Sequence, residues 1–308
     1  MDSRPKLLVA LGLEGHDAPT VRYASKLCEW LEASTITFVH VLRRYELDHA
    51  PYRVFPDLRR SILDAAGNQC RALVEERGSI PKGTEVRYEV LEGSPAIEVA
   101  RAASQTDADL VLVGRKDERS WTDHMAERIS RKVPCSVLVV PESAEPSIAK
   151  VLVAVDFSNR SRRAVEEAAL FARSAGAVAV RMLHAFSIPV FPYAVPELPL
   201  DARKGVAEAT ETEADTFRRS LDLGAFDAPV ILKEDTRPPH AIREAVDEEN
   251  ADLVVLGSKG RTDVAALLLG SVAEKAVGTL PCPVFVVRAK GDTTSFLKEL
   301  LGEATASP

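Results

Sequence analysis

An internal duplication limits the possible folds of this chain more than any other feature of its sequence. Four segments of the first half recur in the same order in the second half, at offsets of 143 to 147 residues: Lys6–Gly12 as Lys150–Asp156, Phe38–Val41 as Met182–Ala185, Asp107–Gly114 as Asn250–Gly257, and Pro134–Val140 as Pro281–Val287. Four matches in one order indicate a tandem repeat of a single structural unit.

Each repeat alternates strand and helix patterns. In the first repeat we expect strands near 6–12, 35–42, 84–91, 109–114 and 136–140, and helices near 18–33, 57–78, 95–106 and 122–132. In the second we expect strands near 150–156, 177–184, 229–234, 252–257 and 283–288, and helices near 159–175, 201–222, 239–249 and 270–279. Strands rich in Val, Ile and Leu with helices between them indicate a parallel sheet covered on both faces. The fold class is therefore α/β, with two tandem doubly wound domains.

The length fits this organisation, because 308 residues provide two domains of about 150. We place the domains at 1–141 and 149–290, joined by the short proline-bearing linker PESAEPSIA. The tail, 291–308, carries one short amphipathic pattern that predicts either a docked terminal helix or a frayed end.

Charge and composition argue against several classes of partner. The net charge of −7 argues against nucleic acid, which usually binds a basic face. No apolar run approaches the roughly 18 residues that span a bilayer, so we expect no membrane association. The start of the chain has no small-residue cleavage pattern of a signal peptide. Four cysteines without CxxC spacing suit a reducing compartment, and we expect a cytoplasmic protein.

The segment from Val254 to Val287 carries the chemistry. A buried strand stops at Gly257, Gly260 follows, and Gly270-Ser271 comes just before a helical run. Glycine lets backbone N–H groups approach an anion closely. The N–H groups and the positive dipole end at the start of a helix favour a phosphate. The spacing therefore predicts a phosphate cradle at the carboxyl ends of the strands, where doubly wound sheets bind ligands.

With the duplication and this spacing in hand, the sequence resembles a tandem universal stress protein. The family motif G-x2-G-x9-G-[S/T] reads here as Gly257, Gly260, Gly270 and Ser271. The flanking LLLGSVAEKAV, CPVFVV and ADLVVLG and the opening KVLVAVDFSNRSRRAVEEA are also similar, and the resemblance covers about 5–141 and 149–288. It implies a five-stranded parallel α/β domain that binds ATP, or that binds no nucleotide where the motif is missing.

The resemblance implies a role for each residue of one site in the second repeat. Asp156 would accept a hydrogen bond from the adenine edge, with Val155 or Phe157 nearby and the backbone of Ala185 against the base. Gly257 and Gly260 would shape the loop around ribose and phosphates. The β and γ phosphates would rest on Gly270, Ser271 and Val272. Arg261, beside Gly260, is a candidate phosphate ligand. The expected cofactor is ATP, with Mg²⁺ left open, and no metal site or catalytic residue is assigned.

The first repeat departs from this pattern where it matters. Gly12 stands in the position of Asp156, Asp117 in that of Gly260, and Asp123-His124 in that of Gly270-Ser271, and the intervening segment is four residues shorter. Two carboxylates in a phosphate cradle would repel a polyphosphate. We therefore expect one ATP per chain, in the second repeat.

Other side chains have ordinary structural interpretations beside functional ones. His40 and His184 lie near the end of the second strand of each repeat, either as hydrogen-bonded strand residues or near a nucleotide. The cysteines read as small buried side chains, and His124 reads as a solvated loop residue without metal-ligand spacing. The apolar, proline-containing segments 43–58 and 186–200 suit either packing between the repeats or a lid or partner surface.

Three classes of function remain open. The leading one is an ATP-binding protein of stress response or signalling, which contacts a protein partner that the sequence does not identify. In the family that the sequence resembles, the last strand of one domain pairs with that of its partner. The resemblance therefore implies that Val137–Val140 and Val284–Val287 pair within the chain as an internal pseudo-dimer, and further homodimerisation is left open. The chain has no GKS/T phosphate loop, so any ATP hydrolysis should be slow. The alternatives are a nucleotide-free scaffold and an adenylate-handling enzyme, against which the glycine-free segment after Asp156 argues.

Overall fold

The structure, a computed structural model, describes residues 4–43, 56–117, 124–188, 200–224, 226–258 and 269–289. The chain forms two compact units. The first contains the residues up to Ser147 together with Leu269 and the described segment from Val277 onward. The second contains Ile148 to Ser258 and Gly270 to Ala276 within the described ranges.

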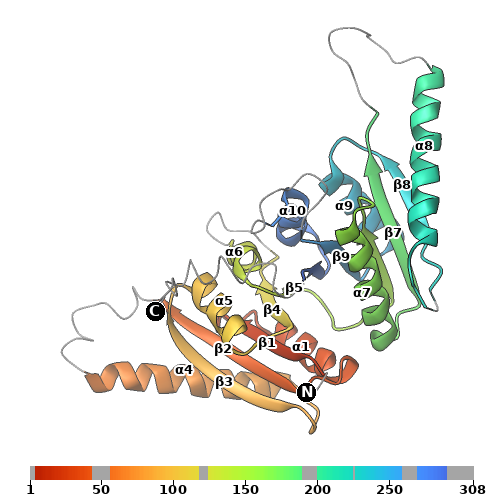
Figure 1. The fold of residues 1–308 in the computed structure, drawn as a ribbon. Coiled ribbons are helices and arrows are strands. Elements are labelled where there is room, and N and C mark those ends of the chain that lie inside the picture. Colours follow the sequence, from red (N-terminus) through yellow and green to blue (C-terminus); the bar gives the residue numbers. More distant parts are fainter. Residues whose placement is uncertain are drawn as a thin grey trace, which may run out of the picture. The chain divides into compact units, whose positions relative to one another are not determined.

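A mostly parallel sheet forms the centre of the first unit (Figure 1). Its strand order is β3-β2-β1-β4-β5-β10, with the bounds β1 (Lys6–Leu11), β2 (Thr35–Arg43), β3 (Glu85–Gly93), β4 (Leu110–Arg115), β5 (Ser136–Pro141) and β10 (Val284–Val287). Leu7 pairs with Ile36 of β2 on one side and with Leu110 of β4 on the other. The β1 residues Leu7–Leu11 are buried, as expected for a central strand covered on both faces.

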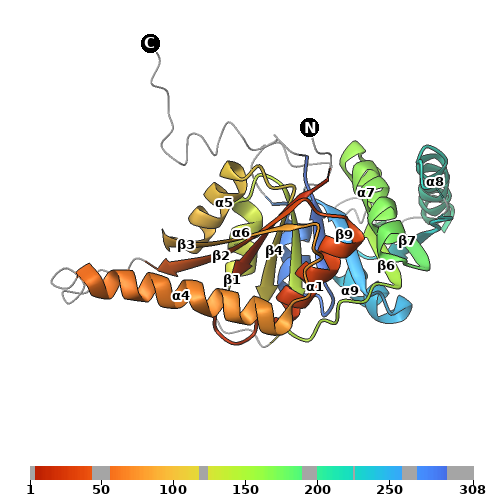
Figure 2. The same cartoon turned by 90° about the horizontal axis from the view of Figure 1, so that it is seen from below.

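Helices cover both faces of this sheet (Figures 1 and 2). They are α1 (Ala18–Trp30), α4 (Pro56–Arg77), α5 (Pro95–Gln105) and α6 (Met125–Lys132). α1 packs with α4, and α5 packs with α6 on the opposite face. α1 and α5 each carry a proline in the first turn, Pro19 and Pro95, where a missing backbone N–H costs no helical hydrogen bond.

The second unit repeats the arrangement with the strand order β9-β6-β7-β8. Its strands are β6 (Lys150–Ala154), β7 (Ala179–Phe186), β8 (Val230–Glu234) and β9 (Leu253–Gly257), and its helices are α7 (Asn159–Ala175), α8 (Leu200–Arg219) and α9 (Pro238–Glu249). α7 begins after Ser158, whose side chain accepts a hydrogen bond from the Ser161 N–H, and ends at Gly176 in the left-handed conformation (φ 72°). α10 (Ser271–Thr279) follows β9 in the chain.

β10 belongs to the second repeat in sequence but to the first unit in space. It pairs antiparallel with β5 in the register Val284 to Val139 and Val286 to Val137, as the sequence predicts for the last strands. The buried Arg288 fixes the end of β10, because its guanidinium donates to the carbonyl oxygens of Val133 and Ser130. Its backbone N–H also donates to the Ser136 hydroxyl at 3.1 Å.

The predicted α/β fold class, with a mostly parallel sheet, is confirmed, and most element bounds lie within two residues of those expected. Two differences concern helix ends: α1 stops at Trp30 rather than near residue 33, and α8 stops at Arg219 rather than near residue 222. The start predicted for the helix near residue 122, the tail 291–308 and most of both apolar, proline-containing segments lie outside the described residues.

Candidate functional site

Both repeats reverse their strand order at the same point. The chain runs outward from β1 to β2 and β3 and then returns to β4 on the other side of β1; β6 and β9 have the same relation in the second unit. Ligands of doubly wound sheets bind beyond the carboxyl ends of the strands at this point. In the second unit those ends lead to Asp156 and Gly257, and in the first they lead to Gly12 and Gly114.

Asp156 sits in a tight turn between β6 and α7. Its Oδ1 accepts the Ser158 N–H at 3.1 Å, a side-chain turn that aspartate often makes. Its own N–H faces the Ser161 hydroxyl at 3.4 Å. The carboxylate is thereby placed at the end of the sheet, as the sequence predicts, and it lines a cavity there.

Phe157 and His184 form a stacked pair beside this turn. Phe157 has a φ of 60°, which is rare for a side chain of this size. Its ring lies 4.1 Å from that of His184 and 5.2 Å from that of Phe217 on α8, measured between centroids. The Nδ1 of His184 lies 2.8 Å from the carbonyl oxygen of Val155, so this nitrogen carries the hydrogen. Both side chains thus hold the end of β6 in place.

The start of α10 lies at the same cavity. The Glu274 N–H donates to the Gly270 oxygen at 2.9 Å, so Gly270 occupies the N-cap position. Gly270 is itself held by a 2.8 Å bond from its N–H to the Ser258 oxygen. The next three residues, Ser271, Val272 and Ala273, line the cavity. The N–H groups of a first helical turn have no partner within the helix and favour an anion.

The cavity of the second unit has a volume of about 200 Å³. Six of the ten residues expected at a nucleotide site line it: Val155, Asp156, Ala185, Gly257, Ser271 and Val272. Phe157 packs on His184 next to it, and Gly270 caps the helix that borders it. Gly260 and Arg261 lie outside the described residues.

Three residues that line the cavity of the second unit were not predicted from the sequence. Ser161 on α7 and Pro238 and Ile242 on α9 also line the cavity. α9 packs on β6 and β7, which brings its first turns to the sheet end. Pro238 marks the start of α9 in the sequence and could have located this helix end. It could not have shown that Ile242 faces the cavity.

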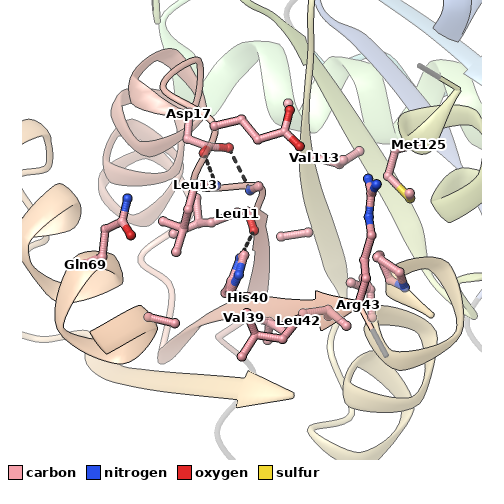
Figure 3. Close-up of a pocket in the computed structure, with 18 of the residues that line it drawn as sticks. Leu11, Leu13, Asp17, Val39, His40, Leu42, Arg43, Gln69, Val113 and Met125 are labelled. Carbon is pink, nitrogen blue, oxygen red and sulfur yellow. Dashed lines mark hydrogen bonds between the residues drawn. The ribbon is translucent and has the colours of Figure 1, made fainter. Parts of the chain in front are cut away.

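In the first unit a different carboxylate occupies the end of β1 (Figure 3). Gly12 stands where the second repeat has Asp156, as expected. The buried Asp17 folds back from the start of α1, and its two oxygens accept the N–H groups of Gly12 at 3.1 Å and of Leu13 at 2.7 Å. His40 repeats the role of His184, with its Nδ1 2.9 Å from the Leu11 oxygen.

A larger cavity, of about 470 Å³, opens at this end of the first sheet. Strand ends form its floor, and α4, α5 and α6 contribute to its walls. Asp117, expected to repel phosphates here, is instead not among the lining residues: its Oδ2 accepts the Ser143 N–H at 3.0 Å, which turns it toward the segment after β5. Asp123 lies outside the described residues.

The other singled-out side chains have structural roles. His124 is half-exposed with its Nδ1 3.4 Å from a Glu127 oxygen. The four cysteines are free and buried. Burial raises the pKa of the Cys28 thiol to about 12 and that of Cys70 to about 11. Cys28 and Cys70 are therefore neutral thiols at neutral pH, which agrees with packing rather than redox chemistry.

Comparison with known proteins identifies relatives along the whole chain. A sequence model of the universal stress protein family matches residues 4–141 and again 147–288. A universal stress protein of Thermus aquaticus is 33% identical over 138 residues, which is 45% of this chain and 97% of the relative. One from Mycobacterium tuberculosis strain H37Rv is 26% identical over 302 residues, covering 94% of each chain.

Solved structures share the tandem fold. A universal stress protein from Archaeoglobus fulgidus superimposes with a TM-score of 0.61 at 19% identity, covering 94% of this chain and 98% of that one. A functionally unknown protein from Pseudomonas aeruginosa PAO1 gives a TM-score of 0.63 at 18% identity, covering 98% of each. Within the described residues, the helices lack the length and apolarity needed to cross a membrane.

Proposed function

This chain belongs to the universal stress protein family, with two copies of its domain, and on that basis we propose that it binds one ATP in its second repeat and acts in stress response or signalling. The observation that carries the proposal is a convergence. The Asp156 carboxylate, the Gly257 strand end and the first turn of α10 all border one cavity.

These groups suit the two ends of a nucleotide. Asp156 and the Ala185 strand end would hold the base, for which a carboxylate accepts a hydrogen bond from an exocyclic amine. About 200 Å³ corresponds to roughly seven water-sized groups, close to the size of a purine ring. The phosphates would lie toward Gly257 and Ser271, which form the family motif together with Gly260 and Gly270, and Arg261 is a further candidate ligand.

The proposed role is binding rather than fast catalysis. In the described part of the chain, the titratable side chains that line the cavity are Asp156 and His184, and both belong to the strand ends assigned to the base. Hydrolysis requires a positioned water and usually a metal beside the γ phosphate. We therefore expect ATP hydrolysis to be slow, with or without Mg²⁺, and the signal to be the nucleotide-bound state itself, read by a protein partner.

The first repeat, in this proposal, binds no ATP. It has no carboxylate at position 12, and Asp17 already occupies the N–H groups of Gly12 and Leu13. It also lacks an equivalent of the Gly270-Ser271 pair at which α10 begins in the second repeat.

Two measurements on the full chain test the proposal. Mass spectrometry of ligand released from the purified protein should find an adenine nucleotide, and titration calorimetry of the stripped protein should give one ATP per chain. Asp156→Ala should weaken ATP by about 10- to 100-fold, because a hydrogen bond to a charged group contributes about 1.5–3 kcal/mol. No measurable ATP affinity would favour the nucleotide-free scaffold, and two ATP per chain would contradict the asymmetry.

A further inference from the structure

We propose that the cavity of the first repeat is a second ligand site, which takes a small amphipathic carboxylate: an apolar body of about twelve carbons with one anionic end. The cavity lies within the first unit and shares no residue with the nucleotide site proposed above. The proposal therefore stands or falls independently of ATP binding.

Size is the first argument. The volume of about 470 Å³ is within the range of small-molecule sites. At the ~30 Å³ that a water-sized group occupies in a liquid, the cavity holds roughly 15 heavy atoms; a twelve-carbon carboxylate is about that size, and ATP is about twice as large.

The body of the cavity is apolar. Its inner wall consists of buried aliphatic side chains from three strands and two helices: Leu11, Val39, Val41, Val99, Val113 and Ile129. α4 adds the half-buried Ile62 and the buried Ala66. In Figure 3 the labelled side chains encircle this space, with Gln69 at one side of the view and Arg43 and Met125 at the other. Such a wall favours a hydrocarbon chain over a sugar or a phosphate.

The polar groups at the ends of β1 and β2 are already engaged. Both oxygens of Asp17 hold backbone N–H groups, and the Nδ1 of His40 is bound to the Leu11 oxygen. A polyphosphate would find neither a helix-start serine nor an available strand-end N–H at Gly12 and Leu13. These groups therefore do not provide the anion site, and the buried aliphatic wall is suited to the uncharged end of the ligand.

Basic side chains at the rim of the cavity could bind a carboxylate. Three basic side chains, His16, Arg43 and Lys116, line the cavity around a single outer acid, Glu14. The Nζ of Lys116 lies 2.8 Å from a Glu14 oxygen, and Glu14 is half-exposed. A hydrogen bond from Lys116 lowers the pKa of Glu14 against the opposing effect of burial, and the charges of Lys116, His16 and Arg43 lower it further. A ligand carboxylate at this rim would meet the same basic groups while Glu14 turns toward solvent.

Calorimetric titration of the full-length protein with dodecanoate, below its micelle concentration, tests the proposal. We expect one saturable site per chain. The methyl ester, which lacks the charge, should bind at least about tenfold more weakly, as expected for loss of a charge-assisted contact. Ile62→Trp, at a half-buried position of the rim, should weaken dodecanoate at least about tenfold by filling the cavity. Lys116→Gln should weaken dodecanoate while leaving the ester unchanged.

Each alternative outcome overturns part or all of the proposal. Absence of saturable binding up to about 1 mM dodecanoate removes the site, provided that circular dichroism shows a folded protein. Unchanged dodecanoate binding in a folded Ile62→Trp variant would place the ligand outside this cavity. Equal affinity for dodecanoate and its methyl ester would show that the site does not recognise the carboxylate. Displacement of dodecanoate by ATP would assign dodecanoate to the cavity of the second repeat. Asp156→Ala is the matched control, because it should lower the affinity for ATP and leave that for dodecanoate unchanged.

Discussion

The ends of β1 and β6 have nearly the same backbone conformation, but they carry their carboxylate at different positions. Leu13 and Phe157, one residue past equivalent positions, both have left-handed φ values of 59° and 60°. His40 and His184 bind equivalent carbonyl oxygens. Yet the carboxylate sits on the strand end in one repeat, as Asp156, and on the helix start in the other, as Asp17. A shift of one carboxylate by five positions thus leaves the strand end and its histidine contact intact and changes the chemistry of the site.

The two cavities differ in size for a related reason. In the first unit Leu13 and His40 both line the cavity, and α4 contributes Ile62, Ala65, Ala66 and Gln69 to it. In the second unit the Phe157 ring fills the space between His184 and Phe217 of α8. None of the described α8 side chains lines the smaller cavity. The two repeats therefore differ by an aromatic ring at this position, and we expect this ring to contribute to the difference in cavity size.

The largest expected effect is on ATP binding. Gly270→Glu places a negative charge and a bulky side chain at the N-cap of α10. Repulsion of a phosphate at ~4 Å with an effective dielectric of about 20 costs about 4 kcal/mol, or close to a thousandfold in affinity. Calorimetry of the variant measures this loss. Gly12→Ala is the matched control: an added Cβ there meets nothing closer than 3.9 Å, so ATP affinity should stay the same.

Thiol chemistry separates the two units. All four cysteines belong to the first unit, and the raised pKa of Cys28, about 12 against an ordinary 9.0, makes its thiolate scarcer by close to a thousandfold at pH 8. Labelling of the native protein with a thiol reagent should therefore be slow and should report on opening of the first unit. Rapid labelling of Cys28, identified by peptide mapping, would show that α1 is not packed as described.

The two carboxylates should have opposite consequences when removed. Asp17→Ala removes the charged acceptor of the Gly12 and Leu13 N–H groups, which lie in a part-buried site, and should lower the free energy of unfolding by about 2 kcal/mol and accelerate cysteine labelling. Asp156→Ala should lower ATP affinity with a smaller effect on stability. Denaturant unfolding and calorimetry of both variants make the comparison, and equal stability losses would contradict the separation of roles.

The smallest effect concerns the aromatic stack. Phe157→Leu gives the second repeat the residue of the first and removes the contacts with His184 and Phe217. The loss of stacking should lower the free energy of unfolding by about 1 kcal/mol. Thermal unfolding without ligand measures it. If the variant also gains affinity for dodecanoate in its second repeat, the aromatic ring alone accounts for the difference between the cavities.

The fold and much of the proposed site follow from local sequence patterns. The duplication, the buried β-branched strands and the glycine positions located Asp156, Gly257 and Ser271 at one sheet end, because strand ends converge in any doubly wound sheet. Ile242 and Ser161 could not be predicted as lining residues, because the face that a helix presents to a cavity depends on tertiary packing. The larger cavity of the first unit could not be predicted for the same reason. Its size depends on how closely α4 approaches strand ends that lie far from it in sequence.

The pairing of β10 with β5 has a consequence for biosynthesis. β5 ends at Pro141 and its partner begins at Val284, so the ribosome adds more than 140 residues before the edge of the first sheet is closed. At ~5–20 residues per second, β5 waits roughly 7 to 30 seconds with its backbone N–H and carbonyl groups unpaired on that edge. Residues made after most of the second repeat, with Arg288 at the end of the strand, therefore complete the first unit. A nascent chain truncated before Val284 should need a chaperone that shields a strand edge.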